Sequence, residues 1–294
     1  MLIATLIASD RIDAGLVSEA RDRIAATGAT AEQPAWLDEA VAVDLFVTGN
    51  DVGDVRGALE GAFAGVDVLV QAAADREKRL LIADMDSTMI PVECIDELAD
   101  YAGIKPQIAE VTERAMRGEL DFAAALDARV ALLKGLAESA IERCLAERVT
   151  LMPGARTLIQ TMRARGAHSV LVSGGFTRFA EPVAAQIGFD RAIANRLVIE
   201  DGELTGAVGK PIVDSATKEA TLRAVAAERG IALSQTLAVG DGANDLPMIR
   251  AAGLGVAYHA KPVVAAAAAA RVEHGDLTAL LYAQGIRRRD WRAD

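Results

Sequence analysis

The sequence has only two cysteines and no long apolar run. Cys94 and Cys144 are too few for a disulfide scaffold or a zinc knuckle, so we expect two buried free thiols. The apolar run over residues 263–270 is far shorter than the roughly 20 residues that cross a bilayer, which excludes a membrane-spanning protein. The first nine residues carry no basic side chain and predict a strand rather than a secretory signal, which favours a cytoplasmic location.

The composition is typical of a globular protein. The chain has 294 residues, of which 52% are hydrophobic and 25% charged, and this length suffices for about two domains. The net charge of −11, from 42 acidic and 31 basic residues, argues against nucleic acid as a partner. Residues 1–75 contain 13 of the acidic residues and only 4 of the basic ones. The rest of the chain is therefore nearly neutral and is compatible with an anionic small substrate.

The pattern of apolar residues predicts two domains and an insert. Residues 1–75 alternate strand-like and helical stretches in the order β-α-β-β-α-β, which predicts a small α+β domain. A buried strand over residues 80–83 opens the second domain, residues 76–294. Within it, residues from about 93 to 150 are helical in pattern, with breaks at Gly103 and Gly135, and predict a helical insert. Alternating strands and helices follow, which predicts a parallel sheet with any active site at the carboxyl ends of its strands.

Several elements of the second domain are predicted individually. We expect strands over residues 168–172 and 236–239, and helices that begin at Thr177 and Asn244. Residues 195–206 predict a hairpin around a Glu-Asp-Gly turn. The alanine run over residues 265–270 predicts a helix against the sheet.

Two carboxylates, Asp84 and Asp86, follow the predicted strand over residues 80–83. Such a pair at the end of a buried strand loses hydration unless a positive charge compensates, and a bound cation would supply it. A turn whose aspartate caps the next helix is the alternative. A calcium-binding loop is excluded, because Met89 and Ile95 stand where that loop needs glycine and glutamate.

A second acidic motif, Gly240-Asp-Gly-Ala-Asn-Asp245, follows the predicted strand over residues 236–239. Its glycines let the backbone turn tightly, so that Asp241 and Asp245 can face a cation near a helix start. A glycine turn in which Asn244 or Asp245 caps a helix explains the same residues without a metal.

Two further features suit a phosphoryl group. Ser173, Gly174 and Gly175 follow a predicted strand and precede a helix, so a hydroxyl and backbone amides could cradle an anion. Neither the glycine spacing of dinucleotide folds nor the lysine of a phosphate-binding loop is present. Lys218 lies near another helix start, where a solvated surface lysine is the ordinary interpretation.

These four elements occur in the order found in the haloacid dehalogenase superfamily of phosphatases, and the chain resembles that superfamily. Over residues 79–285 it is more specifically similar to the phosphoserine phosphatase family, through the residues around Glu93, Phe122 and Arg129 as well. The fold that this resemblance implies is α/β, a Rossmann-like parallel sheet with a helical cap. Residues 1–75 resemble, more loosely, the small ACT-like, ferredoxin-like domain that precedes the catalytic part in some members.

The resemblance implies Mg²⁺-dependent hydrolysis of O-phospho-L-serine through an aspartyl-phosphate, the last step of L-serine biosynthesis. Asp84 would be the nucleophile and Asp86 the general acid and base. Magnesium would be held by Asp84, Asp86 through its main-chain carbonyl, and Asp241, with Asp245 ordering its water shell.

The resemblance also implies the groups that bind the substrate. The phosphoryl group would contact Ser173, Gly174, Lys218 and Asn244. Glu93 would bind the ammonium and Arg129 the carboxylate, since a guanidinium pairs bidentately with a carboxylate. Met116 and Phe122 would close over the substrate, although packing within the helical insert would be the preferred interpretation of both side chains without the resemblance.

Three alternatives stay open from the sequence. The chain could hydrolyse another small phosphomonoester, or pass the phosphoryl group to an alcohol. A non-enzymatic sensor of amino acids is a third, but such a protein has no reason to keep Asp84, Asp86, Lys218 and Asp241 together. Residues 1–75 could bind an effector or form a homodimer through a sheet edge.

Overall fold

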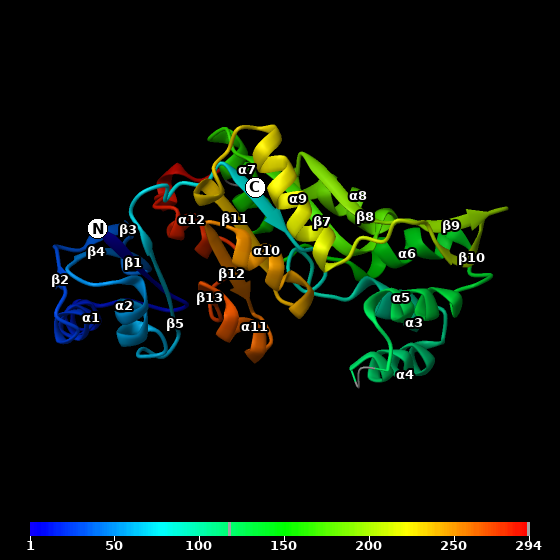
Figure 1. Cartoon of the computed structure of the whole chain (residues 1–294), viewed down its shortest axis with the longest axis horizontal. Helices are drawn as coiled ribbons and strands as arrows, with labels where there is room; N and C mark the ends of the chain where they lie inside the picture. The colour runs from blue at the N-terminus through cyan, green and yellow to red at the C-terminus, as the bar shows by residue number, and fades with distance from the viewer. Residues whose placement is uncertain (117–118, 293–294) are drawn as a thin grey trace.

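The computed structural model describes residues 1–116 and 119–292, which form two large sheets joined by a short connection and one two-stranded sheet (Figure 1). The first sheet is antiparallel, with strand order β2-β4-β1-β5 and with β3 also paired to β4. Its elements are β1 (Leu2–Ala8), α1 (Ala14–Ala26), β2 (Thr30–Ala31), β3 (Ala35–Asp38), β4 (Ala42–Thr48), α2 (Val52–Leu59) and β5 (Val66–Ala72).

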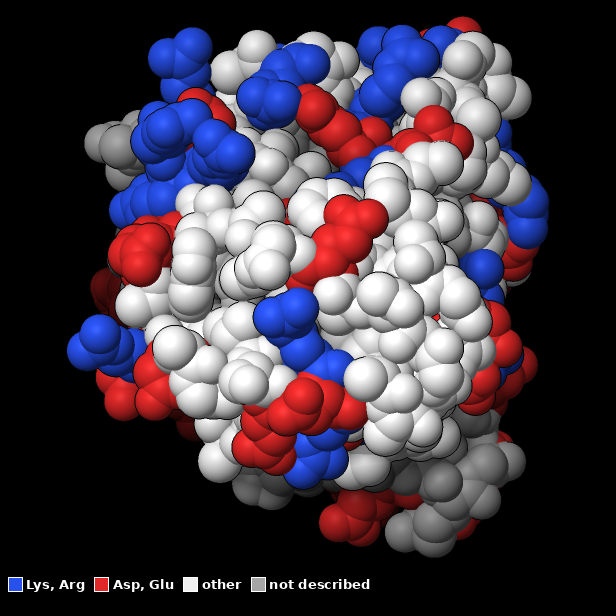
Figure 2. Space-filling model, turned by 90° about the vertical axis from the view of Figure 1, so that its left-hand side faces the viewer, with Lys and Arg blue, Asp and Glu red and all other residues white. Residues whose placement is uncertain are grey.

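The antiparallel sheet is covered on both faces. Val17 and Ile24 of α1 and Val55 of α2 pack with strand residues on one face, and α12 (Ala279–Ala283) packs on the other. The predicted β-α-β-β-α-β order is confirmed with one extra strand. α2 ends at Leu59, because Glu60 is extended and Gly61 has a φ of 74°. Figure 2 shows the outer face of this part, where acidic side chains lie in separate groups among uncharged ones, so its negative charge forms no continuous patch there.

The second sheet is parallel, with strand order β13-β12-β11-β6-β7-β8. Its strands are β6 (Leu80–Ala83), β7 (His168–Phe176), β8 (Arg191–Asn195), β11 (Thr236–Gly240), β12 (Leu254–Tyr258) and β13 (Ala270–Val272). All four residues of β6 are buried, as expected for a strand covered on both faces. Because β11, β6 and β7 are neighbours, their carboxyl ends bring the three predicted motifs together.

Helices cover both faces of the parallel sheet. One face packs against α7 (Ala155–Ala164), α8 (Thr177–Ile187) and α12. The other packs against α9 (Ser215–Glu228), α10 (Leu246–Ala251) and α11 (Pro262–Ala267). Short 3-10 turns span residues 233–235, 243–245 and 288–290. The predicted α/β class is therefore confirmed.

The insert between β6 and β7 is helical, as predicted, and lies at the opposite end of the molecule from the antiparallel sheet (Figure 1). It consists of α3 (Cys94–Tyr101), α4 (Lys105–Met116), α5 (Phe122–Ala131) and α6 (Glu138–Arg148), and its breaks at Gly103 and Gly135 have positive φ. The predicted hairpin forms β9 (Leu197–Glu200) and β10 (Glu203–Val208) and lies against α5. Leu204 exchanges backbone hydrogen bonds with residues 135 and 136, so the hairpin holds the insert.

Three local predictions need correction. β7 does not end near Val172 but continues through both glycines to Phe176. The helix expected from Asn244 begins at Leu246, after a 3-10 turn. The alanine run is helical only to Ala267. Ala268 is extended, and Ala270 pairs with Val256, so strand pairing outweighs the helical preference of alanine.

No helix in the described ranges is long and apolar enough to cross a membrane. Cys94 and Cys144 are buried free thiols, as predicted.

The exact residue that separates the two domains stays a prediction, because the segment that connects the sheets is itself tightly bound to both.

Arg76 holds this connection in place. Its guanidinium donates to both oxygens of Asp44 at 2.7 Å and to the carbonyl oxygens of Tyr282 and Ala283 at 3.0 and 2.9 Å. Asp44, in β4, is only 1% exposed and also accepts from Thr5. The antiparallel sheet is thus fastened to α12 through a buried ion pair.

Arg76→Met should lower the free energy of unfolding by about 3–5 kcal/mol, because it leaves Asp44 buried without its cation. Urea unfolding monitored by circular dichroism measures this. Arg165→Met, which breaks an exposed ion pair with Glu77, is the matched control and should cost less than about 1 kcal/mol. Adding Asp44→Asn to Arg76→Met should restore part of the loss. If Arg76→Met and Arg165→Met lowered the free energy of unfolding by the same small amount, this would contradict a structural role for the buried pair.

Candidate active site

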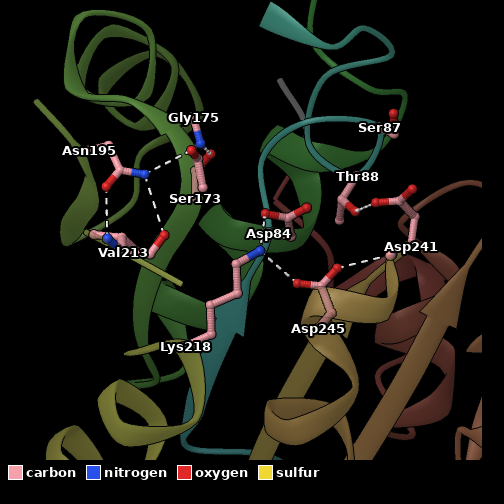
Figure 3. Close-up of polar contacts among 12 residues, drawn as sticks. Asp84, Ser87, Thr88, Ser173, Gly175, Asn195, Val213, Lys218, Asp241 and Asp245 are labelled. Carbon is pink, nitrogen blue, oxygen red and sulfur yellow. Dashed lines mark hydrogen bonds and ion pairs between the residues drawn. The ribbon is translucent and has the colours of Figure 1, made fainter. Parts of the chain in front are cut away.

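A buried ammonium lies at the centre of the candidate site (Figure 3). Lys218 Nζ donates to Asp84 Oδ1 at 2.5 Å and to Asp245 Oδ1 at 2.6 Å, and the lysine is 1% exposed. Burial opposes the charge on Lys218, but the two carboxylates outweigh burial and raise its pKa, so the lysine stays protonated. The surface-lysine interpretation of Lys218 is therefore wrong.

Local structure directs each partner toward this point. Asp84 follows β6, and its amide donates to Val239 O of β11 at 3.0 Å. Asp214 caps α9 by accepting from the Thr217 amide at 2.8 Å, which fixes the helix turn that carries Lys218. Asp245 folds back over the turn after β11, where its Oδ2 accepts from the Gly242 amide at 3.0 Å.

Glycine is required at position 240 for this arrangement. A Cβ atom there would overlap the carboxyl group of Asp245, which is itself fully buried. Any side chain at Gly240 would therefore displace Asp245 from Lys218.

Three carboxylates meet beside the ammonium. One oxygen each from Asp84, Asp241 and Asp245 can be chosen so that all lie within 4.8 Å of one another. Burial, followed by the charges of Asp84 and Glu93, raises the pKa of Asp241 from 3.8 to about 6. An all-oxygen set of mutually repelling carboxylates fits a hard divalent cation such as Mg²⁺.

The carboxyl group of Asp86 is not among these three. Its contribution to a metal, predicted through the main-chain carbonyl, stays a prediction, and so does the place of Asp245 in the outer shell of that metal. Asp86 is partly buried, and its Oδ1 is fully buried and has no hydrogen-bond partner among the described residues. Burial, and then Glu93 and Asp84, raise its pKa well above 3.8. A raised pKa favours the protonated form of this carboxyl group, which is the form that a general acid needs.

Ser173 and Gly174 lie on the extended end of β7, next to β6. The Gly175 amide donates to Ser173 Oγ at 2.8 Å, so the serine hydroxyl keeps its own hydrogen for another acceptor. The ring of Phe122 lies against Gly174, where an added Cβ would be 3.2 Å from its Cζ atom. The insert therefore reaches down to the strand end.

The insert contributes one acidic and one basic group to the cavity. Glu93 accepts from Ser87 Oγ at 2.9 Å, and burial raises its pKa. Arg129 donates through Nε to Ala125 O at 3.3 Å, and no described carboxylate lies within ion-pair distance of its guanidinium. Burial lowers the pKa of Arg129, although Asp96 and Glu93 partly oppose this. The two terminal nitrogens of the Arg129 guanidinium are therefore available to a ligand.

Together these groups line a cavity of about 350 Å³ between the sheet and the insert. The predicted residues on its wall are Asp84, Asp86, Glu93, Phe122, Arg129, Ser173, Gly174, Asp241 and Asn244. Lys218 and Asp245 lie directly behind this wall, where Lys218 donates to both Asp84 and Asp245. Met116 ends α4, but its side chain lies outside the part of the structure that is described.

Sequence reasoning missed three polar residues on the wall, Asp96, Thr112 and Lys261. Asp96 follows Glu93 by three residues at the start of α3, so helical spacing could have identified it. Lys261 precedes the alanine-rich α11 and has no distinctive sequence signal. Only the course of the chain after β12 brings it to the cavity.

Comparison with known proteins finds one family of hydrolases and, among the similar proteins, several phosphoserine phosphatases. The haloacid dehalogenase-like hydrolase family matches residues 81–250. A phosphoserine phosphatase of Streptomyces coelicolor is 50% identical over 256 residues, which cover 86% of this chain and 62% of that protein. The chain thus spans less than two thirds of that relative's length. A phosphoserine phosphatase of Streptococcus thermophilus is 48% identical over 68% of this chain and 93% of its own length.

A solved structure resembles nearly the whole chain. The unliganded form of a probable phosphoserine phosphatase from Vibrio cholerae has a TM-score of 0.79 and is 33% identical. The match covers 98% of this chain and 88% of that one, so the likeness includes the antiparallel sheet as well as the parallel one.

Asp241→Asn should stabilise the protein when divalent metal is removed by a chelator at pH 7, because it relieves repulsion among three carboxylates. The folded protein holds the Asp241 proton more tightly than the unfolded chain, so this repulsion grows as the pH rises from 3.8 to about 6. The melting temperature of the variant should exceed that of the wild type by a few degrees at pH 7 and match it near pH 4.

Magnesium should reverse this order of melting temperatures, because it should raise the melting temperature of the wild type more than that of Asp241→Asn. Asp10→Asn, at an exposed position, is the control and should follow the wild type throughout. Equal stabilisation of all three proteins by magnesium would argue against a metal at this cluster.

Proposed function

Because the chain belongs to the haloacid dehalogenase-like hydrolase family, we propose that it hydrolyses O-phospho-L-serine to L-serine and phosphate. This reaction would be the last step of L-serine biosynthesis. The observation that carries the proposal is one cavity with a carboxylate cluster at its floor and both Glu93 and Arg129 on its wall. The substrate carries a phosphate, an ammonium and a carboxylate, and the cavity offers a complementary group for each.

The first half of the reaction transfers the phosphoryl group to Asp84. Lys218 occupies Oδ1 of Asp84, so the other oxygen attacks phosphorus. The bond from phosphorus to the serine oxygen breaks, its electron pair stays on that oxygen, and the oxygen takes the proton of Asp86. The raised pKa of Asp86 supports this role, because it favours the protonated carboxyl group that the step requires. L-Serine leaves, and an aspartyl-phosphate remains.

The second half returns Asp84 to its carboxylate. Asp86, now ionised, accepts a proton from a water molecule whose oxygen attacks phosphorus. The bond between phosphorus and Asp84 breaks, and inorganic phosphate is released. The insert above the sheet excludes bulk water during the first transfer.

The residues around Asp84 would neutralise the charges of the phosphoryl group. Mg²⁺ held by Asp84, Asp241 and the Asp86 carbonyl, with Asp245 beside it, would let an anionic carboxylate approach an anionic phosphate. Ser173 and Gly174 would donate to phosphoryl oxygens. Lys218 and Asn244 would contact the phosphoryl group as well.

The groups of the insert would select the amino acid. Glu93 would bind the ammonium, and the unpaired fork of Arg129 would bind the carboxylate bidentately. Phe122 would close over the substrate, and so would Met116. A cytoplasmic location and a homodimer stay predictions.

Arg129→Met should remove the preference for a substrate with a carboxylate. The kcat/KM for O-phospho-L-serine should fall about 100-fold, whereas that for O-phosphoethanolamine, which lacks the carboxylate, should fall less than about threefold. Phosphate release with magnesium and with a chelator measures both rates. The wild type should be inactive with the chelator and prefer O-phospho-L-serine.

Lys105→Met is the matched control, since it removes an exposed cation from the insert outside the cavity. It should leave both substrates unaffected. Equal losses on both substrates in Arg129→Met would contradict its role in specificity. A wild type that prefers another monoester, or that phosphorylates an added alcohol, would contradict the proposed substrate or reaction.

A further inference from the structure

Asn195 is a buried amide to which the reaction described above gives no role. It ends β8, is 1% exposed and lies beside β7 in the sheet, paired with Phe176. Its Nδ2 donates to Gly174 O at 2.8 Å and to Val213 O at 3.3 Å, and its Oδ1 accepts from the Val213 amide at 2.7 Å. Figure 3 shows this side chain between the strand end that bears Ser173 and the segment at Val213.

The contact with Val213 fixes which end of the amide faces Gly174. Oδ1 must accept the hydrogen of the Val213 amide, because an NH₂ group at that position would place two donors together. Nδ2 is therefore the atom that faces Gly174 O. Val213 immediately precedes Asp214, the cap of α9, so the anchor of the Asn195 amide is the fixed start of that helix.

The hydrogen bond to Gly174 O fixes the peptide that follows it. In a trans peptide, the carbonyl of one residue and the amide hydrogen of the next point in opposite directions. Holding Gly174 O toward Asn195 therefore turns the Gly175 amide away from Asn195. That amide donates to Ser173 Oγ at 2.8 Å, which occupies a lone pair of the hydroxyl and leaves its hydrogen free.

We infer that Asn195 is a positioning residue that orients the Ser173 hydroxyl as a donor to the phosphoryl group, acting through the peptide between Gly174 and Gly175. This inference rests on the proposed phosphatase function. It follows from three hydrogen bonds: the Val213 amide donates to Asn195, Asn195 donates to Gly174 O, and the Gly175 amide of the same peptide donates to Ser173. Without the first two, rotation of the glycine peptide would free Ser173 to donate its hydrogen elsewhere.

A purely structural role for Asn195 predicts a different outcome, and kinetics distinguish the two. Asn195→Ala should lower kcat for O-phospho-L-serine about 10- to 100-fold, because a misplaced donor weakens transition-state contacts. KM should change less than about threefold, since Glu93 and Arg129 are not affected.

Gln71→Ala is the matched control. Gln71 is also a buried amide, 7% exposed, which donates to Ala283 O at 2.7 Å and does not line the cavity. It should lower the melting temperature as Asn195→Ala does and leave kcat unchanged. Unchanged kcat in Asn195→Ala would overturn the inference.

A double-mutant cycle tests the route through Ser173. If Asn195 acts through that hydroxyl, the variant Ser173→Ala/Asn195→Ala should be within about threefold of Ser173→Ala alone. Losses that multiply in the double variant would overturn the inference, because they would show that Asn195 acts independently of Ser173.

Binding of inorganic phosphate, measured by calorimetry with magnesium present, repeats the cycle without turnover. Each single variant should weaken binding about tenfold, and the double variant no further. Multiplied losses here would also overturn the inference. A wild type that leaves O-phospho-L-serine intact would instead refute the proposed substrate, while the phosphate-binding cycle would still decide the role of Asn195.

Discussion

The buried ion pairs of Lys218 with Asp84 and Asp245 determine how the rest of the site is arranged. A lysine that is 1% exposed keeps its charge only if carboxylates surround it, and here two do so at 2.5 and 2.6 Å. Those contacts fix one oxygen of Asp84 and turn Asp245 back over the strand end. The same carboxylates, with Asp241, form a cluster whose oxygens lie close enough together to hold a further cation. One buried positive charge thus organises both the proposed nucleophile and the proposed metal site.

Strand order makes this arrangement possible. β6 lies between β11 and β7, so Asp84 has the acidic turn on one side and the serine and glycine segment on the other. The insert between β6 and β7 then adds Glu93, Phe122 and Arg129 from above. The antiparallel sheet contributes nothing to the cavity wall and is instead bound to α12 through Arg76 and Asp44. The sheet could thus influence catalysis only through contacts distant from the cavity.

Much of this could be predicted from the sequence, for identifiable physical reasons. Asp84 and Asp241 follow uninterrupted apolar runs, and such runs predict buried strands whose carboxyl ends meet. Lys218 has no such signal. Only the resemblance of the chain to a known family indicates that this lysine contacts the phosphoryl group. The prediction that the helix continues to Ala270 is wrong. Alanine favours a helix locally, but the pairing of Ala270 with Val256 places that residue in a strand. Asn195 and Lys261 depend on contacts between segments distant in the sequence, which local patterns do not encode.

The central claim is that Asp84 attacks phosphorus, and the most direct measurement is phosphate release by Asp84→Asn compared with Asp127→Asn, whose aspartate pairs with Lys210 at an exposed position. The amide keeps the shape of the carboxyl group but is not a nucleophile. We predict that Asp84→Asn releases phosphate from O-phospho-L-serine at less than about a thousandth of the wild-type rate, while Asp127→Asn matches the wild type. Substantial turnover by a folded Asp84→Asn protein would contradict the account.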